Sequence, residues 1–83
     1  MSLCDLERNR PAVIARIVVP DTPEQQHLAL RLIEIGFVPG ERVRVVAHGH
    51  PGREPIAVRL GHTTFALRRH EAALVLLDAE AQA

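Results

Sequence analysis

Residues 23–35 form the one long segment of this sequence whose apolar residues follow the 3.6-residue repeat of an α-helix. Its ends are well marked: Thr22 suits the N-cap, Pro23 the first helical position, and Gly36 the position after the last turn, where φ is positive. The regular segments on either side repeat every two residues, which is typical of strands with one buried face. The chain is therefore expected to be mostly β, with one inserted helix.

The predicted strands are short and are separated by turns. In the first of them, Val13, Ala15, Ile17 and Val19 are expected to share the buried face. Gly61-His62 is expected to form a tight hairpin turn. Strands are predicted at residues 12–19, 41–48, 56–60, 63–67 and 74–77, with a single helical turn at 68–73. Because closing a sheet removes its exposed edges, these strands predict a small, partly closed antiparallel barrel.

The predicted helix has one broad apolar stripe and one mostly polar side. The stripe consists of Leu28, Ala29, Leu32, Ile33 and Ile35. The opposite side consists of His27, Leu30, Arg31 and Glu34. Leu30 is thus an apolar residue on the polar side, where a core residue is not expected.

Composition excludes several classes of protein. The 83 residues suffice for one domain, 1–83, with a predicted core at about 12–78. Ten acidic residues balance ten basic ones, so the chain is not expected to bind a nucleic-acid backbone. It has no Trp and no Tyr, so it lacks the aromatic rings against which proline-rich peptides and single-stranded nucleic acids pack. No apolar run is long enough to cross a bilayer, the N-terminus does not resemble a signal peptide, and Cys4 is the single cysteine. We therefore expect a cytoplasmic protein.

Catalysis is not expected. The sequence contains no glycine-rich phosphate loop, no paired-carboxylate motif and no HExxH motif, and no serine follows Ser2. His62 lies beside Thr63 and Thr64, but no orienting partner accompanies them.

An ordered series of residues across more than half of the chain resembles a known family. The series comprises Leu30, Gly36-Phe37-x-Pro39-Gly40, Val43, Val45, Pro51, Pro55, Gly61, and Ala66-Leu67-Arg68-x-x-Glu71-Ala72. In this order the residues resemble the signature of the ferrous iron transport protein A (FeoA) family. The resemblance implies an SH3-like barrel with a helix inserted after the first strand. The sequence also resembles the C-terminal SH3-like domain of iron-dependent repressors, but this chain has no room for the DNA-binding helices of those proteins.

The FeoA resemblance implies a non-enzymatic accessory protein of bacterial ferrous iron uptake. Its partner would be the membrane ferrous iron transporter, bound and regulated through the transporter's GTP-binding domain, which would hold this chain at the inner membrane. The alternative function is a soluble protein that binds or senses transition metals with surface histidines.

Phe37 has two interpretations, since it follows the predicted end of the helix. It can pack back against the apolar stripe as the hydrophobic contact of a helix C-cap. It can also join Leu30 and Pro39 in an apolar patch that a partner covers. A ring that buries one face and exposes the other would do both, so Leu30, Glu34, Phe37 and Pro39 are the predicted partner-binding residues.

The five histidines suggest incidental metal binding. On a continuous strand His48 and His50 would project from the same side, and imidazole is a ligand for both zinc and iron. A closed structural zinc site needs four ligands, and no cluster in the sequence supplies them. No cofactor is expected to be required. Zinc or Fe(II) held by His48, His50, His62 or His27 is expected where two chains meet, as a metal-bridged homodimer.

Overall fold

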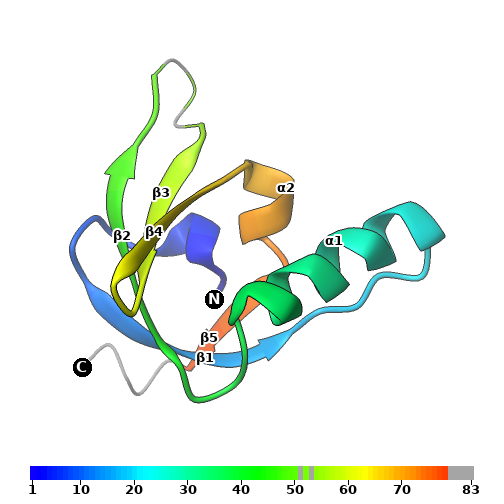
Figure 1. The fold of residues 1–83 in the computed structure, drawn as a ribbon. Helices are drawn as coiled ribbons and strands as arrows, with labels where there is room; N and C mark the ends of the chain where they lie inside the picture. The colour runs from blue at the N-terminus through cyan, green and yellow to red at the C-terminus, as the bar shows by residue number, and fades with distance from the viewer. Residues whose placement is uncertain (51, 53, 79–83) are drawn as a thin grey trace.

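The computed structural model describes residues 1–50, 52 and 54–78 and shows one antiparallel sheet of five strands with a helix after the first strand. The strand order in the sheet is β4-β3-β2-β1-β5. The sheet curves around the core, and the long helix lies across one side of it (Figure 1). The strands are β1 (Pro11–Ile17), β2 (Arg42–His48), β3 (Ile56–Leu60), β4 (Thr63–Leu67) and β5 (Val75–Asp78). The helices are the 3₁₀-helix η1 (Leu3–Asp5), α1 (Pro23–Ile35) and the single turn α2 (Arg69–Ala72).

The β3–β4 hairpin has the predicted bounds and register. Ile56 pairs with Leu67 and Leu60 with Thr63, and Gly61 in the turn has a φ of 61°. The inward face of β3 is formed by Ile56, Val58 and Leu60, which are buried. Here the two-residue repeat is uninterrupted, so the sequence pattern and the packed face coincide.

The predicted buried face of the first strand is wrong. Ala12 and Ile14 are buried, whereas Ala15 is exposed and Val19 lies beyond the strand with 55% of its surface exposed. The reason is a β-bulge: the register between β1 and β5 shifts between Ile14 and Arg16. A bulge inserts an extra residue, so the inward-facing positions change sides along the strand. A single two-residue repeat therefore cannot describe the whole of β1.

The N-terminal segment belongs to the core, which the predicted core of about 12–78 left out. Leu3 and Leu6 expose only 0% and 1% of their surface to solvent. The Cys4 amide donates to Ser2 Oγ at 3.2 Å and the Ser2 amide to Asp5 Oδ2 at 3.0 Å, which caps η1. The Leu77 amide donates to the Met1 carbonyl oxygen at 2.8 Å, so this segment is also tied to β5.

Helix α1 begins and ends at the predicted residues. The Gln25 amide donates to Thr22 Oγ1 at 3.4 Å at the N-terminus. At the C-terminus Gly36 has a φ of 117°, its amide donates to the Ile33 carbonyl oxygen at 3.1 Å, and the Phe37 amide donates to that of Leu32 at 2.9 Å. This pair of hydrogen bonds is a Schellman motif.

The predicted apolar stripe of α1 is broader than the face that is buried. Ala29 and Leu32 are buried, but Ile33 and Ile35 each expose 38% of their surface. At 100° per residue, Ile33 and Ile35 flank the line through Ala29 and Leu32 on opposite sides. The helix is fully buried only along that line, so both flanks stay partly open.

No helix in the described part of the chain combines the length and the apolar character that crossing a bilayer requires. The longest of them, α1, has 13 residues.

Candidate partner-binding surface

The C-terminal half of α1 presents three large apolar side chains to solvent. Leu30 exposes 54% of its surface, and Ile33 and Ile35 each expose 38%. Leu30, Ile33 and Glu34 are related by three and four positions, so they lie together on one face of the helix. We call this group the α1 surface. Glu34 is exposed beside its two apolar members, as the sequence predicted for Leu30 and Glu34.

Phe37 does not belong to an exposed surface, and the prediction that its ring shows one face to a partner is wrong. Phe37 exposes 0% of its surface to solvent. The Schellman motif turns the chain so that Phe37 packs into the core that also contains Leu32, which is the usual hydrophobic contact of this motif. Its ring meets that of Phe65 edge to face, with centroids 5.6 Å apart and an interplanar angle of 62°.

Pro39 lies in the turn that follows and is exposed. The Glu41 amide donates to the Val38 carbonyl oxygen at 3.1 Å, and Gly40 has a φ of 91°. These are the features of a type II turn, in which proline at the second position and glycine at the third are favoured. Pro39 is therefore held at the surface by the turn, while the ring two residues earlier is buried.

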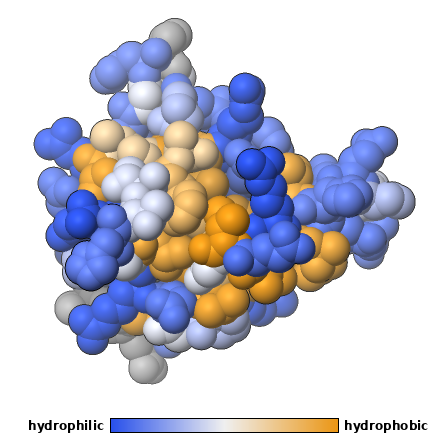
Figure 2. Space-filling model, viewed as in Figure 1, coloured by the Kyte–Doolittle hydropathy of each residue, from blue (hydrophilic) through white to orange (hydrophobic). Residues whose placement is uncertain are grey.

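Ile35 lies on the other side of α1 and lines a cleft between this helix and β4. We call it the α1–β4 cleft; it has a volume of about 120 Å³. Its lining includes Leu28, Arg31, Ile35, Phe65 and Glu71. A neighbouring hollow of about 330 Å³, at the β3–β4 turn, shares Ile35 and Phe65 with it. Figure 2 shows hydrophobic side chains gathered between β4 and α1 on the face shown, with hydrophilic side chains around them.

Sequence reasoning missed this cleft. The helical repeat assigned Ile33 and Ile35 to the buried stripe, and nothing in the sequence pairs α1 with β4. β4 is the last strand at one edge of the described sheet. An edge strand keeps backbone groups available for pairing. The signal that could have suggested a surface here is the number of apolar residues on α1, which exceeds what one side of a helix can bury in so small a domain.

The structure does not bring the four predicted metal ligands together. No group of three or more His, Cys, Asp or Glu side chains suited to a metal occurs among residues 1–50, 52 and 54–78. β2 ends at His48, so the continuous strand that would align His48 with His50 is not formed. A Cβ atom on Gly49 would lie 2.3 Å from the Glu54 carbonyl oxygen, so this position requires glycine.

The other two predicted ligands, His62 and His27, lie apart from His48. His48 pairs with Ile56 at one end of β3, while His62 is exposed in the turn at the other end. A strand of five residues separates its ends by roughly 13 Å. His27 is exposed on α1. Among the described residues, a site with three or more such ligands would need a second molecule.

We therefore expect metal binding to be independent of folding. A chelator should leave the midpoint of thermal unfolding unchanged and should dissociate any dimer that zinc induces, because the core is apolar and the histidines lie outside it. Differential scanning calorimetry and light scattering on the same samples measure both effects. Unfolding by the chelator would contradict this expectation and would make the metal part of the fold.

Comparison with known proteins places the chain in a family. The family model described as the FeoA domain matches residues 1–79. Comparison with curated protein sequences finds no significant match.

Several solved structures are similar over most of this chain. The zinc complex of Stenotrophomonas maltophilia FeoA is 42% identical, covers 100% of this chain and 95% of its own, and has a TM-score of 0.89. It is described as an SH3 domain protein and a candidate ferrous iron transport activating factor. Iron(II) transport protein A from Clostridium thermocellum is 31% identical, covers 94% of this chain and 44% of its own, and has a TM-score of 0.75. A manganese-dependent transcriptional repressor, 21% identical over 93% of this chain and 40% of its own with a TM-score of 0.77, shares the fold.

The family match over residues 1–79 agrees with the arrangement of the strands and of α1, and with the SH3-like description of the Stenotrophomonas structure. The predicted fold and the predicted family are both confirmed. This chain belongs to the FeoA family and has its SH3-like fold.

Proposed function

We propose that this protein is a cytoplasmic accessory protein of bacterial ferrous iron uptake. It binds the membrane ferrous iron transporter and regulates it through the transporter's GTP-binding domain, which holds it at the inner membrane. The proposal rests on membership of the FeoA family, whose Stenotrophomonas member is described as a candidate activating factor for ferrous iron transport.

The α1 surface is the part of the molecule that supports a binding role. Leu30 exposes more than half of a large apolar residue on a regular helix, and that exposed part contributes nothing to folding. Ile33 extends the apolar area along the same face, and Glu34 supplies a charge at its border. Apolar residues rimmed by polar ones are typical of surfaces that another protein covers.

Two substitutions test the proposal. Leu30→Asp and Glu34→Arg should each weaken binding to the cytosolic GTP-binding portion of the transporter by about tenfold or more, because one buries a carboxylate in an apolar contact and the other reverses a charge. Biolayer interferometry with and without guanine nucleotide measures the affinity. Circular dichroism should show that both variants keep the wild-type helix, since both side chains are exposed.

Matched controls separate loss of the surface from a general change of charge. Glu24→Arg makes the same change in the first turn of α1, roughly 15 Å from Glu34, and Thr64→Asp adds an acid to an exposed position on β4. Both controls should bind like the wild type. Wild-type affinity in Leu30→Asp and Glu34→Arg would place the interface elsewhere, with residues 48–55 the next region to test.

A further inference from the structure

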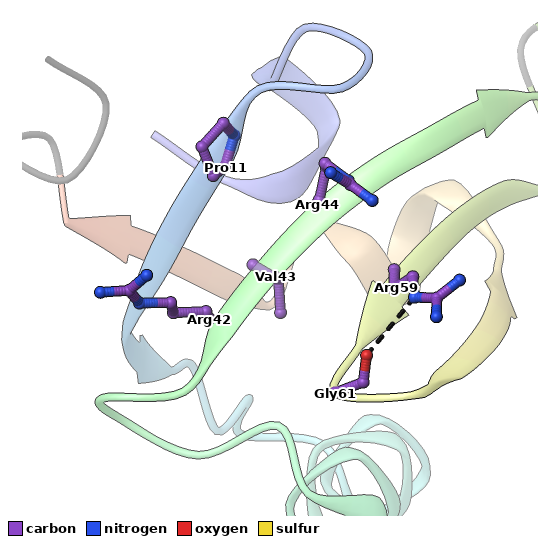
Figure 3. Close-up of a pocket in the computed structure, with 6 residues that line it drawn as sticks. All are labelled: Pro11, Arg42, Val43, Arg44, Arg59 and Gly61. Atoms are coloured by element: carbon purple, nitrogen blue, oxygen red, sulfur yellow. Dashed lines mark hydrogen bonds between the residues drawn. The ribbon is translucent and has the colours of Figure 1, made fainter.

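The outer face of the sheet carries a cluster of arginines. Arg42 and Arg44 lie on β2 and Arg59 on β3, all three exposed, around an open depression of about 250 Å³ that Pro11 also lines. We call this the arginine face. Figure 3 shows Arg44 and Arg59 extending in a similar direction from neighbouring strands, while Arg42 reaches toward β1.

The arrangement costs the fold stability. Arg44 and Arg59 are directly opposite each other in the β2–β3 register. Like charges in that position repel and destabilise a sheet. Arg59 Nε donates to the Gly61 carbonyl oxygen at 3.4 Å, and none of the three guanidinium groups forms an ion pair within the described part of the chain. The chain has ten acidic residues, yet none of those in residues 1–50, 52 and 54–78 pairs with this cluster.

We propose that the arginine face binds an acidic protein segment in extended conformation. Arg42 and Arg44 are two positions apart on one strand, so their Cα atoms are separated by roughly 6–7 Å. Carboxylates at alternate positions of an extended peptide repeat at the same distance along the chain, and such a segment is long enough to meet Arg42 on one side as well as Arg44 and Arg59 on the other. Guanidinium groups bind carboxylates in a bidentate manner, and binding would neutralise the repulsion between Arg44 and Arg59.

Other anionic occupants fit the face less well. A single phosphate ion could not contact all three groups, because Arg42 reaches away from the other two (Figure 3). An anionic membrane gives only about 1 kcal/mol for each basic residue, and none of the large exposed apolar side chains lines this depression. Single-stranded nucleic acid stacks on exposed aromatic rings, but Phe37 is buried and Phe65 is packed against the core.

This inference is independent of the proposed transporter partner, because the face lies on β2 and β3 and not on α1. The test uses the full chain and a labelled peptide of alternating glutamate and threonine, with its glutamine counterpart as the uncharged probe. Fluorescence anisotropy at low salt should show binding of the glutamate peptide only. The double variant Arg44→Gln, Arg59→Gln should bind it about tenfold more weakly, since it loses two ion pairs.

The matched control is Arg16→Gln with Arg68→Gln, which removes the same charge from exposed positions that do not line the depression. It should change the affinity by less than about twofold. Arg59→Glu should abolish binding and raise the unfolding midpoint by about 1–4 °C, because it creates an attractive pair with Arg44. That rise would show that lost binding is not lost folding.

Three results would overturn the proposal. They are an equal loss in the control variant, equal binding of the glutamine peptide, and tighter binding to phosphatidylglycerol vesicles or single-stranded DNA than to the glutamate peptide. An equal loss in the control variant would mean that the affinity depends only on the overall charge of the protein. Equal binding of the glutamine peptide would mean that carboxylates are not recognised. The third would assign the face to a membrane or to nucleic acid.

Discussion

A chain that carries both Leu3→Ala and Leu6→Ala should be largely unfolded at room temperature. Both side chains are buried and belong to the hydrophobic core cluster. Each substitution removes buried apolar groups and leaves a cavity, which costs about 2–5 kcal/mol in other proteins. A small domain has only about 5–15 kcal/mol of stability in total, so the pair removes most or all of it.

Urea denaturation followed by circular dichroism measures this effect. Each single variant should shift the transition to lower urea and keep its slope, and the double variant should show little folded baseline. Val19→Ala is the control, because 55% of that side chain is exposed and its truncation should change stability by less than about 0.5 kcal/mol. A double variant as stable as Val19→Ala would show that η1 is an appendage and not part of the core.

The second large effect is expected at Phe37. Phe37→Ala should lower the free energy of unfolding by about 3–5 kcal/mol, because the ring is fully buried and the truncation leaves a large cavity. The edge-to-face contact with Phe65 is lost as well, and such contacts contribute about 0.5–1.5 kcal/mol beyond burial. Urea denaturation and the loss of near-ultraviolet phenylalanine signals report the change.

Phe37→Leu is the matched variant, since it keeps an apolar side chain at the Schellman position and should cost less than Phe37→Ala. Leu30→Ala serves as the surface control and should leave stability within about 0.5 kcal/mol of the wild type. Together these variants distinguish the two interpretations of Phe37 that the sequence left open, as a core residue and as part of a partner-binding surface. Reduced partner binding by Phe37→Ala without destabilisation would restore Phe37 to the interface and contradict its burial.

Phe37 supports the α1 surface from inside the core. Phe37 fixes the end of α1 by packing into the core, while the exposed residues lie on the turns before it. The hydrogen bonds from the Gly36 and Phe37 amides hold the last turn of the helix in place. A partner that covers Leu30 therefore meets a rigid helix, and less conformational entropy is lost on binding.

Local conformation was accessible from the sequence because it depends on a few neighbouring residues. Thr22 and Pro23 determine where α1 begins, and Gly36 determines where it ends, since each residue suits a specific backbone geometry. Gly61 likewise permits the turn between β3 and β4. The exposed position of Leu30 and Glu34 also followed from the helical repeat alone.

Burial and proximity were decided only by the tertiary structure, because they depend on which distant segments pack together. The bulge near Ala15 reverses the faces of β1 through its pairing with β5, some sixty positions later in the chain. The same packing buries Leu3 and Leu6 and exposes the flanks of α1. Arg44 and Arg59 are fifteen positions apart, and only the β2–β3 register makes them neighbours. A repeat in the sequence shows which residues share a face, but the contacting elements determine which face is buried.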